Sequence, residues 1–241
     1  MAKKPAPHPL ATFASAALLA LLGGCSVTPL QINQSNVTSG SVDAVWRLTP
    51  SGAGGLQVQV EGYRAKSTQH LDENTSVYTG EQTTLTGPLD IRNSATVQRA
   101  FVGYNHQLFA DQPVRLQWFA GIGWARARWD SVPQAQPPQT YSGTVSGSGP
   151  AGGVLAAWQV TPLLALEAAA FGGVSGLVAD AASSIDWAQT ELGLALTLAA
   201  PVRLRMGWAS RSLRASTPDS WQSDLTADTR GPYVRLAFEF R

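Results

Sequence analysis

Apolar and polar residues alternate strictly in several stretches of this chain. In residues 201–208, PVRLRMGW, the apolar side chains occupy the even-numbered positions and two arginines lie between them. Successive side chains of a β-strand point to opposite faces, so this spacing predicts a strand with one apolar face and one charged face. The same even-numbered apolar phase recurs at 114–122, 192–198 and 234–240. The main element of the fold is therefore expected to be the strand.

Eight strands are predicted after residue 55, where no helical periodicity of comparable strength occurs. The connections between them alternate between very short turns, such as Thr161-Pro162, and long polar loops. Short turns at one end and long loops at the other are typical of small outer-membrane barrels. An even number of antiparallel strands would place both ends of the barrel segment on the short-turn side. The predicted strands cover about 56–66, 96–109, 114–128, 153–161, 162–177, 185–199, 201–214 and 231–241.

The odd-numbered positions of these strands are mostly polar or small. An eight-stranded barrel has an interior just wide enough for side chains to fill, so charged groups there are expected to pair across it. Removing one partner of a buried ion pair typically costs about 3–5 kcal/mol, which makes a mixture of signs necessary. The predicted interior charge network consists of Glu61, Glu167, Glu191, Glu239, Arg99, Arg115, Arg203, Arg205 and Arg235.

The even-numbered apolar positions would then face lipid. Aromatic side chains gather at the two membrane interfaces, and two groups fit that placement. Trp124, Trp129, Trp187 and Trp208 lie near the long-loop ends of their strands, and Tyr104, Phe109, Trp158 and Phe240 lie near the short-turn ends. The predicted fold class is all-β: an eight-stranded antiparallel up-and-down transmembrane β-barrel after a signal peptide and a flexible linker. A soluble sheet with its apolar face inside has the same alternation and stays open as an alternative.

The composition restricts the partners and the redox chemistry. Charged residues make up 14% of the chain, and only Lys66 follows the two lysines near the start. An ordinary soluble domain has about 25% charged residues. The formal net charge is +1 and the arginines are scattered, so no nucleic-acid partner is predicted. The single cysteine, Cys25, excludes an intrachain disulfide.

The first 25 residues have the parts of an export signal. Two lysines at positions 3 and 4 precede a short apolar stretch at 10–22 and two glycines. The sequence that ends this stretch, LGGC, resembles the lipobox of bacterial lipoproteins. That resemblance implies acylation of Cys25, and Ser26 after it implies sorting to the outer membrane under the family's enteric rule. Acyl chains add about 0.8 kcal/mol of membrane affinity per buried CH₂.

The predicted domain organisation follows from these features. Residues 26–54 are rich in Ser, Thr, Asn, Gln, Gly and Pro, which is typical of a tether. The apolar segment VDAVWRL, residues 42–48, is either an additional strand or a plug inside the barrel. The expected boundaries are a signal peptide at 1–24, a lipidated tether at 25–54 and an outer-membrane barrel domain at 55–241.

Two segments resemble small eight-stranded outer-membrane proteins of the OmpA, OmpX and opacity-protein type. They are VQRAFVGYNHQLF, residues 97–109, and YVRLAFEFR, residues 233–241. The second resembles the C-terminal signal read by the barrel-assembly machinery, although it ends in Arg241 where that signal has an aromatic residue. The resemblance implies the outer membrane of a Gram-negative bacterium, with anchoring at Cys25. Its implied partners are outer-membrane lipids, the barrel-assembly and lipoprotein-export machinery, and an extracellular or envelope partner bound by the long loops.

No catalytic, metal or cofactor site is predicted. His70 lies near Asp72 and Glu73, where a solvated loop is favoured over a metal site. His106 lies on the apolar phase near a short turn, whereas lipid-A deacylases use a lipid-facing His and Ser near the outer surface. The expected function is a lipid-anchored outer-membrane barrel with a structural, adhesive or envelope-interaction role and no open pore. The alternatives are a soluble lipocalin-like lipoprotein that binds an apolar ligand and, third, a lipid-A-modifying enzyme.

Overall fold

The computed structural model describes most of the chain, and almost all of the described residues lie in strands. The signal peptide predicted at 1–24 and the candidate lipidation residue Cys25 lie outside the described residues. No helix in the described part is long and apolar enough to cross a membrane. The described residues are 26–49, 51, 53–78, 84–109, 112–134, 139–175, 184–216 and 225–240.

The predicted all-β, mostly antiparallel character is confirmed. The strands of the described part are β1 (Ser26–Thr28), β2 (Leu30–Gln34), β3 (Ser39–Arg47), β4 (Gly54–Leu71), β5 (Thr75–Tyr78), β6 (Thr84–Thr86), β7 (Leu89–Leu108), β8 (Val114–Pro133), β9 (Tyr141–Gln159), β10 (Leu164–Val174), β11 (Ser184–Ala199), β12 (Val202–Ser216) and β13 (Leu225–Phe240).

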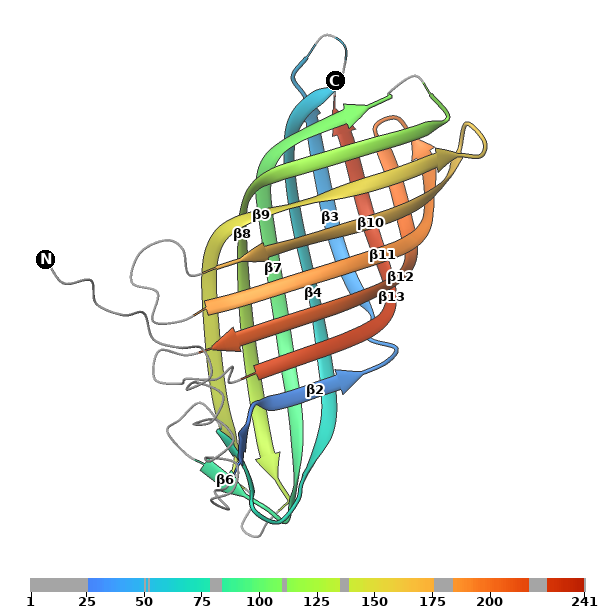
Figure 1. Ribbon diagram of the computed structural model, residues 1–241. Coiled ribbons are helices and arrows are strands. Elements are labelled where there is room, and N and C mark those ends of the chain that lie inside the picture. Colours follow the sequence, from blue (N-terminus) through green and yellow to red (C-terminus); the bar gives the residue numbers. More distant parts are fainter. Residues whose placement is uncertain are drawn as a thin grey trace, which may run out of the picture.

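Nine of the described strands form a closed ring (Figure 1). The order around it is β3, β4, β7, β8, β9, β10, β11, β12 and β13, and β13 pairs again with β3. Every neighbouring pair is antiparallel except the last, in which β13 and β3 run in the same direction. Closure removes the free sheet edges that an open sheet of this size would expose.

The ring has one strand more than the eight predicted, and the extra strand is β3. It contains most of the VDAVWRL segment, so that segment is an additional strand and not a plug. Its side chains alternate in the same way as elsewhere: Asp43 and Val45 are buried, and Val42 and Trp46 are exposed. The prediction of a flexible tether over 25–54 is therefore wrong for this part. β3 supplies the edge that joins β4 to β13.

An odd number of strands places the two ends of the ring on opposite sides. β13 ends on the short-turn side, and β3, which is parallel to it, begins on the long-loop side. The prediction that both ends lie on the short-turn side is wrong for this reason. The connections on the short-turn side span 48–53, 109–113, 160–163 and 200–201, and those on the other side span 72–88, 134–140, 175–183 and 217–224.

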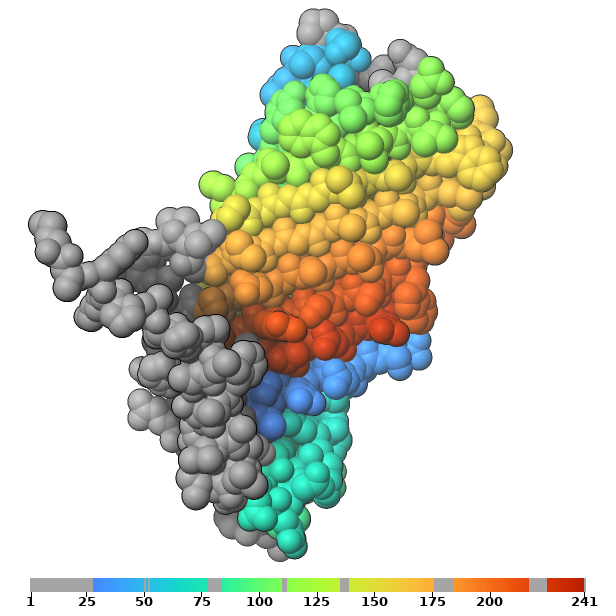
Figure 2. All heavy atoms as spheres, viewed as in Figure 1, coloured from blue at the N-terminus to red at the C-terminus, as the bar shows by residue number. Residues whose placement is uncertain are grey.

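β2 continues the direction of β3 across a bend. It pairs in parallel with the first part of β13, where Gln31 lies opposite Thr226. The bend at 35–38 includes Asn36 with a φ of 63° and is held by the Val37 N–H, which donates to the Arg230 carbonyl at 2.9 Å. In Figure 2, β2 (blue) lies directly below β13 (red).

The inside of the ring divides into two halves. The half toward the long-loop end is an apolar core, and the half toward the short turns holds polar and charged side chains beside a smaller apolar cluster of Phe101, Phe119, Ala151 and Phe171. Several strands extend farther toward the long-loop end than predicted, because β4 continues to Leu71 and β8 to Pro133. The apolar core consists of Leu30, Ile32, Val37, Tyr63, Ala65, Leu71, Val77, Ile91, Ala95, Val97, Ala125, Ala127, Trp129, Val145, Ile185, Leu213, Ala215, Leu225 and Ala227.

Candidate functional site

An apolar band surrounds the outside of the short-turn half. Every strand of the ring contributes large apolar side chains that are at least about two-fifths exposed, and Leu192 and Ile122 reach 69% and 65%. On β8 the band extends ten residue steps, from Val114 to Trp124. At about 3.4 Å per step and a strand tilt of about 40°, its height is about 26 Å. The apolar belt of a transmembrane barrel is about 25 Å tall.

The outward-facing positions become polar beyond the band. On β8 the residues that follow Trp124 on the outer face are Arg126 and Arg128, and on β4 Val60 is followed by Gly62, Arg64 and Lys66. The outer surface therefore changes from apolar to polar while the strands continue. The polar strand ends and their loops form one part, which we call the polar head.

Six of the eight aromatic residues predicted to face the membrane interfaces lie on the outer surface, and two lie in the interior. Trp124, Trp208 and all four residues assigned to the short-turn ends are exposed on the outside. Trp129 is 1% exposed in the apolar core, and Trp187 faces the interior, with its ring 5.9 Å from that of Phe171. Both occupy odd-numbered positions, which face inward, so their assignment to the outer aromatic band is wrong.

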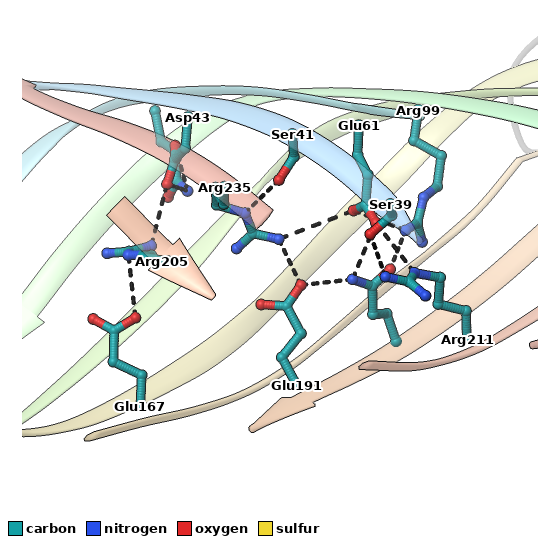
Figure 3. A network of polar contacts seen from close by, with 12 residues as sticks. Ser39, Ser41, Asp43, Glu61, Arg99, Glu167, Glu191, Arg205, Arg211 and Arg235 are labelled. Atoms are coloured by element: carbon teal, nitrogen blue, oxygen red, sulfur yellow. Dashed lines mark hydrogen bonds and ion pairs between the residues drawn. The ribbon is translucent and has the colours of Figure 1, made fainter. Parts of the chain in front are cut away.

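The interior charges form a layer of ion pairs centred on Glu61 (Figure 3). Its carboxylate lies 2.9 Å from a guanidinium nitrogen of Arg99 and 3.2 Å from Nε of Arg211. A nitrogen of Arg235 lies 3.9 Å from Glu61 and 2.5 Å from Glu191. These five side chains are at most 5% exposed, so water screens them little.

A second group of ion pairs joins β3, β10 and β12. Nε of Arg205 lies 3.1 Å from Glu167, and another nitrogen of the same guanidinium lies 3.5 Å from Asp43 (Figure 3). Together the two groups contain four buried carboxylates and four buried guanidinium groups: Asp43, Glu61, Glu167, Glu191, Arg99, Arg205, Arg211 and Arg235. The layer is therefore balanced in charge, as a low-dielectric interior requires.

The three remaining residues of the predicted network lie closer to the short-turn mouth. Glu239 accepts from Nε of Arg47 at 2.9 Å and lies 3.7 Å from Arg203. Arg115 donates to the side-chain oxygen of Gln159 at 2.9 Å. The structure thus brings the nine predicted residues to the interior, with Arg115 bound to an amide and not to one of the predicted glutamates.

Little free space remains between these side chains. The cavity beside Glu61 and Arg99 has a volume of about 10 Å³, and the one lined by Arg115, Arg203 and Glu239 about 40 Å³. A cavity needs about 10–15 Å³ of such volume to hold one water molecule. Within the described part, these cavities hold at most a few water molecules.

Three charged residues of the interior in the described part were not predicted from the sequence. Asp43 and Arg47 lie on β3, which was not counted as a strand of the barrel. Arg211 lies on β12 at an odd-numbered position and is fully buried. Continuing the alternation from 201–208 to the end of that strand would have found it.

His70 and His106, the two histidines of the described part, lie apart from the interior network. Nδ1 of His70 lies 2.6 Å from Asp90, and Nε2 lies 3.6 Å from Asp72. The hydrogen bond to Asp90 raises the pKa of His70 above its ordinary value. The described residues contain no group of three side chains suited to hold a metal ion. His106 lies between Tyr104 and Trp118 on the outer face, with ring centroids 6.2 Å and 5.8 Å away.

Comparisons with known proteins add no family. No protein-family model matches the chain. No curated protein matches it, and no solved structure does.

Proposed function

We propose that this protein is an outer-membrane β-barrel with a filled interior that presents the polar head at the cell surface. Its role is structural or adhesive, or it binds a partner of the cell envelope, and it conducts no solute. The observation that carries the proposal is the apolar band, which surrounds a ring whose inner face carries balanced ion pairs. Apolar patches larger than a few hundred Å² are rare on soluble monomers and typical of membrane or protein contacts.

The orientation follows from the two kinds of connection. Bacterial outer-membrane barrels have short periplasmic turns and longer extracellular loops. The short turns of this chain therefore belong on the periplasmic side, next to the band. The polar head belongs outside, where its loops and strand ends are available to a partner.

The filled interior supports a role without transport. The ion-pair layer occupies the half of the ring that lies within the band, and the apolar core occupies the other half. A permeating ion would have to displace buried, paired charges, which is costly in a low-dielectric interior. We therefore expect no stable conductance in planar bilayers.

The soluble lipocalin-like alternative receives less support. A lipocalin-like protein would place its apolar alternating face inside, around a ligand cavity, and ligand cavities measure about 300–1,000 Å³. Here the exposed apolar side chains are outside, and the cavity within the ion-pair layer is about 10 Å³. The lipid-A-modifying alternative depends on His106, which pairs with Gly54 near the short-turn end, far from the polar head.

The experiment that tests the proposal is heat-modifiable migration of the protein in membrane fractions. An inserted barrel resists detergent at room temperature, migrates faster in the gel, and shifts on boiling. Extraction with urea or carbonate should leave it in the membrane. A chain that starts at Ser26 and folds in water without any amphiphile would contradict the proposal.

A further inference from the structure

The first described strands, β1 and β2, lie at the long-loop end of the ring. We propose that the segment before β3 lies on the same side of the membrane as the long loops, opposite the end of β13. An acyl group on Cys25 would then be displayed on the polar-head side of the membrane. The inference rests on the proposed membrane barrel and adds the side on which its N-terminal segment lies.

The first observation is the parallel seam between β3 and β13. Eight residue pairs join the two strands, from Ser39 opposite Tyr233 to Trp46 opposite Phe240. Side chains support the pairing, because Nε of Arg235 donates to Oγ of Ser41 at 2.9 Å. Parallel neighbours begin at the same end, so β3 begins where β13 begins, on the long-loop side.

The second observation is the position of β2. Its exposed residues Gln31 and Asn33 are polar, as expected for a segment beyond the apolar band. The backbone N–H of Gln31 donates to the side chain of Gln69 at 2.9 Å, and its carbonyl accepts from Ser67 at 3.1 Å. Both partners lie near the end of β4 that enters the 72–88 connection.

The third observation is β1, which pairs with the connection itself. Ser26 lies opposite Thr75 and Thr28 opposite Val77, both in β5. Three contacts, with β13, β4 and β5, therefore hold the segment from Ser26 to Gln34 at one end of the ring. β5 belongs to the connection between β4 and β7, which is on the long-loop side.

A periplasmic position for this segment would require the chain to cross the membrane once more before it enters β3 at the long-loop end. The route inside the ring is filled, since the cavity beside Glu61 and Arg99 has a volume of about 10 Å³. The route outside would place extended backbone in lipid, where each unsatisfied N–H or C=O group costs several kcal/mol. On the long-loop side, the backbone N–H and C=O groups of this segment can all form hydrogen bonds.

Labelling of one introduced cysteine at a time, in intact cells and with a membrane-impermeant maleimide, tests the inference. The reporters are Asn33→Cys on β2, Asp72→Cys after β4, and Gln112→Cys in a short turn, all at exposed positions. The parent protein, whose single cysteine is Cys25, is the labelling blank. We expect N33C and D72C to label in intact cells, and Q112C to label only after the outer membrane is permeabilised.

The outcomes separate this inference from the proposed function. If D72C labels in intact cells while N33C and Q112C label only after permeabilisation, the inference is overturned and the membrane barrel stands. Labelling of Q112C alone in intact cells would support the inference and overturn the proposed orientation. Equal labelling of all three reporters in intact cells would mean that no membrane separates them. That result would overturn both the inference and the proposed membrane barrel.

A disulfide cross-link tests the parallel pairing without a membrane. Gln31 and Thr226 are directly opposite in neighbouring strands. Neighbouring strands lie about 4.7–4.9 Å apart, and a disulfide spans about 4.4–6.8 Å between Cα atoms. We expect the Q31C/T226C pair to oxidise in detergent micelles. The matched control is Q31C/R230C, which is displaced by four residues. Equal oxidation of the two pairs, or none in the first, would contradict the seam.

Discussion

Replacing Leu194 with arginine tests the apolar band directly. Leu194 lies on β11 with its side chain 40% exposed on the outer face. Its cross-strand neighbours are Leu166 and Met206, which are exposed to a similar degree. An arginine at this position would project into lipid from the middle of an apolar surface.

The free-energy cost of L194R depends on how deep residue 194 lies in the apolar band. Four residue steps separate Leu194 from Thr190, the first polar residue on the outer face of β11, which corresponds to a depth of about 10 Å. That is close to the middle of a band about 25 Å tall. Arginine at the bilayer midplane of a barrel costs about 2–4 kcal/mol, so we expect about 3 kcal/mol.

The assay is urea titration of folding into lipid vesicles, followed by tryptophan fluorescence and by the gel shift. Ser146→Arg is the matched control, because Ser146 faces outward from the exposed part of β9 that belongs to the polar head. It should change the free energy of unfolding by less than about 0.5 kcal/mol. Equal effects of L194R and S146R, or improved folding of L194R in water, would refute the lipid-facing placement.

Three further predictions concern the interior, the polar head and the packing. Glu61→Gln removes the carboxylate shared by three arginines and should lower the free energy of unfolding by about 3–5 kcal/mol, measured by urea titration in micelles. Asp90→Asn should lower the pKa of His70, measured by NMR, because the hydrogen bond that His70 donates to the Asp90 carboxylate is what raises it. Gly143→Ala should cost about 1–3 kcal/mol, since its new methyl group would overlap the Trp129 ring.

Each of these has a control. Glu73→Gln removes an exposed carboxylate and should leave stability unchanged, so a similar loss from E61Q and E73Q would contradict the buried pairing. Gly40→Ala meets no atom within 4 Å and should be tolerated where Gly143→Ala is not. For His70, the raised pKa stabilises the folded state fully below the unfolded pKa. That contribution disappears as the pH rises through the folded value, and in D90N this pH dependence should weaken.

The alternation of the sequence predicts which face each strand turns inward. It works where one face is apolar and the other polar, as in β12, and it predicts the inward position of Arg205 and Glu191. It fails at the long-loop ends, where the outer face is polar and short-range signals resemble those of loops. The strand ends near Leu71 and Pro133 were missed for this reason.

Two other features depend on contacts that sequence patterns do not specify. The bend at 35–38 reverses the phase, so Leu30 and Ile32 face inward although they occupy even-numbered positions. The closure of the ring depends on a partner strand at the far end of the chain. An alternating segment such as 42–48 indicates a strand, but which strand pairs with it depends on the geometry of the whole ring.

The seam between β3 and β13 also sets an order of assembly. Ser41 and Arg235, which form a hydrogen bond across it, are 194 residues apart in the chain. Contacts of such large sequence separation form slowly, because the entropy of closing the loop is lost before the contact stabilises it. β3, which is synthesised before β13, must therefore wait for it. Until β13 is in place, β3 and β12 each present an unpaired strand edge, and such an edge is a template for pairing with another chain.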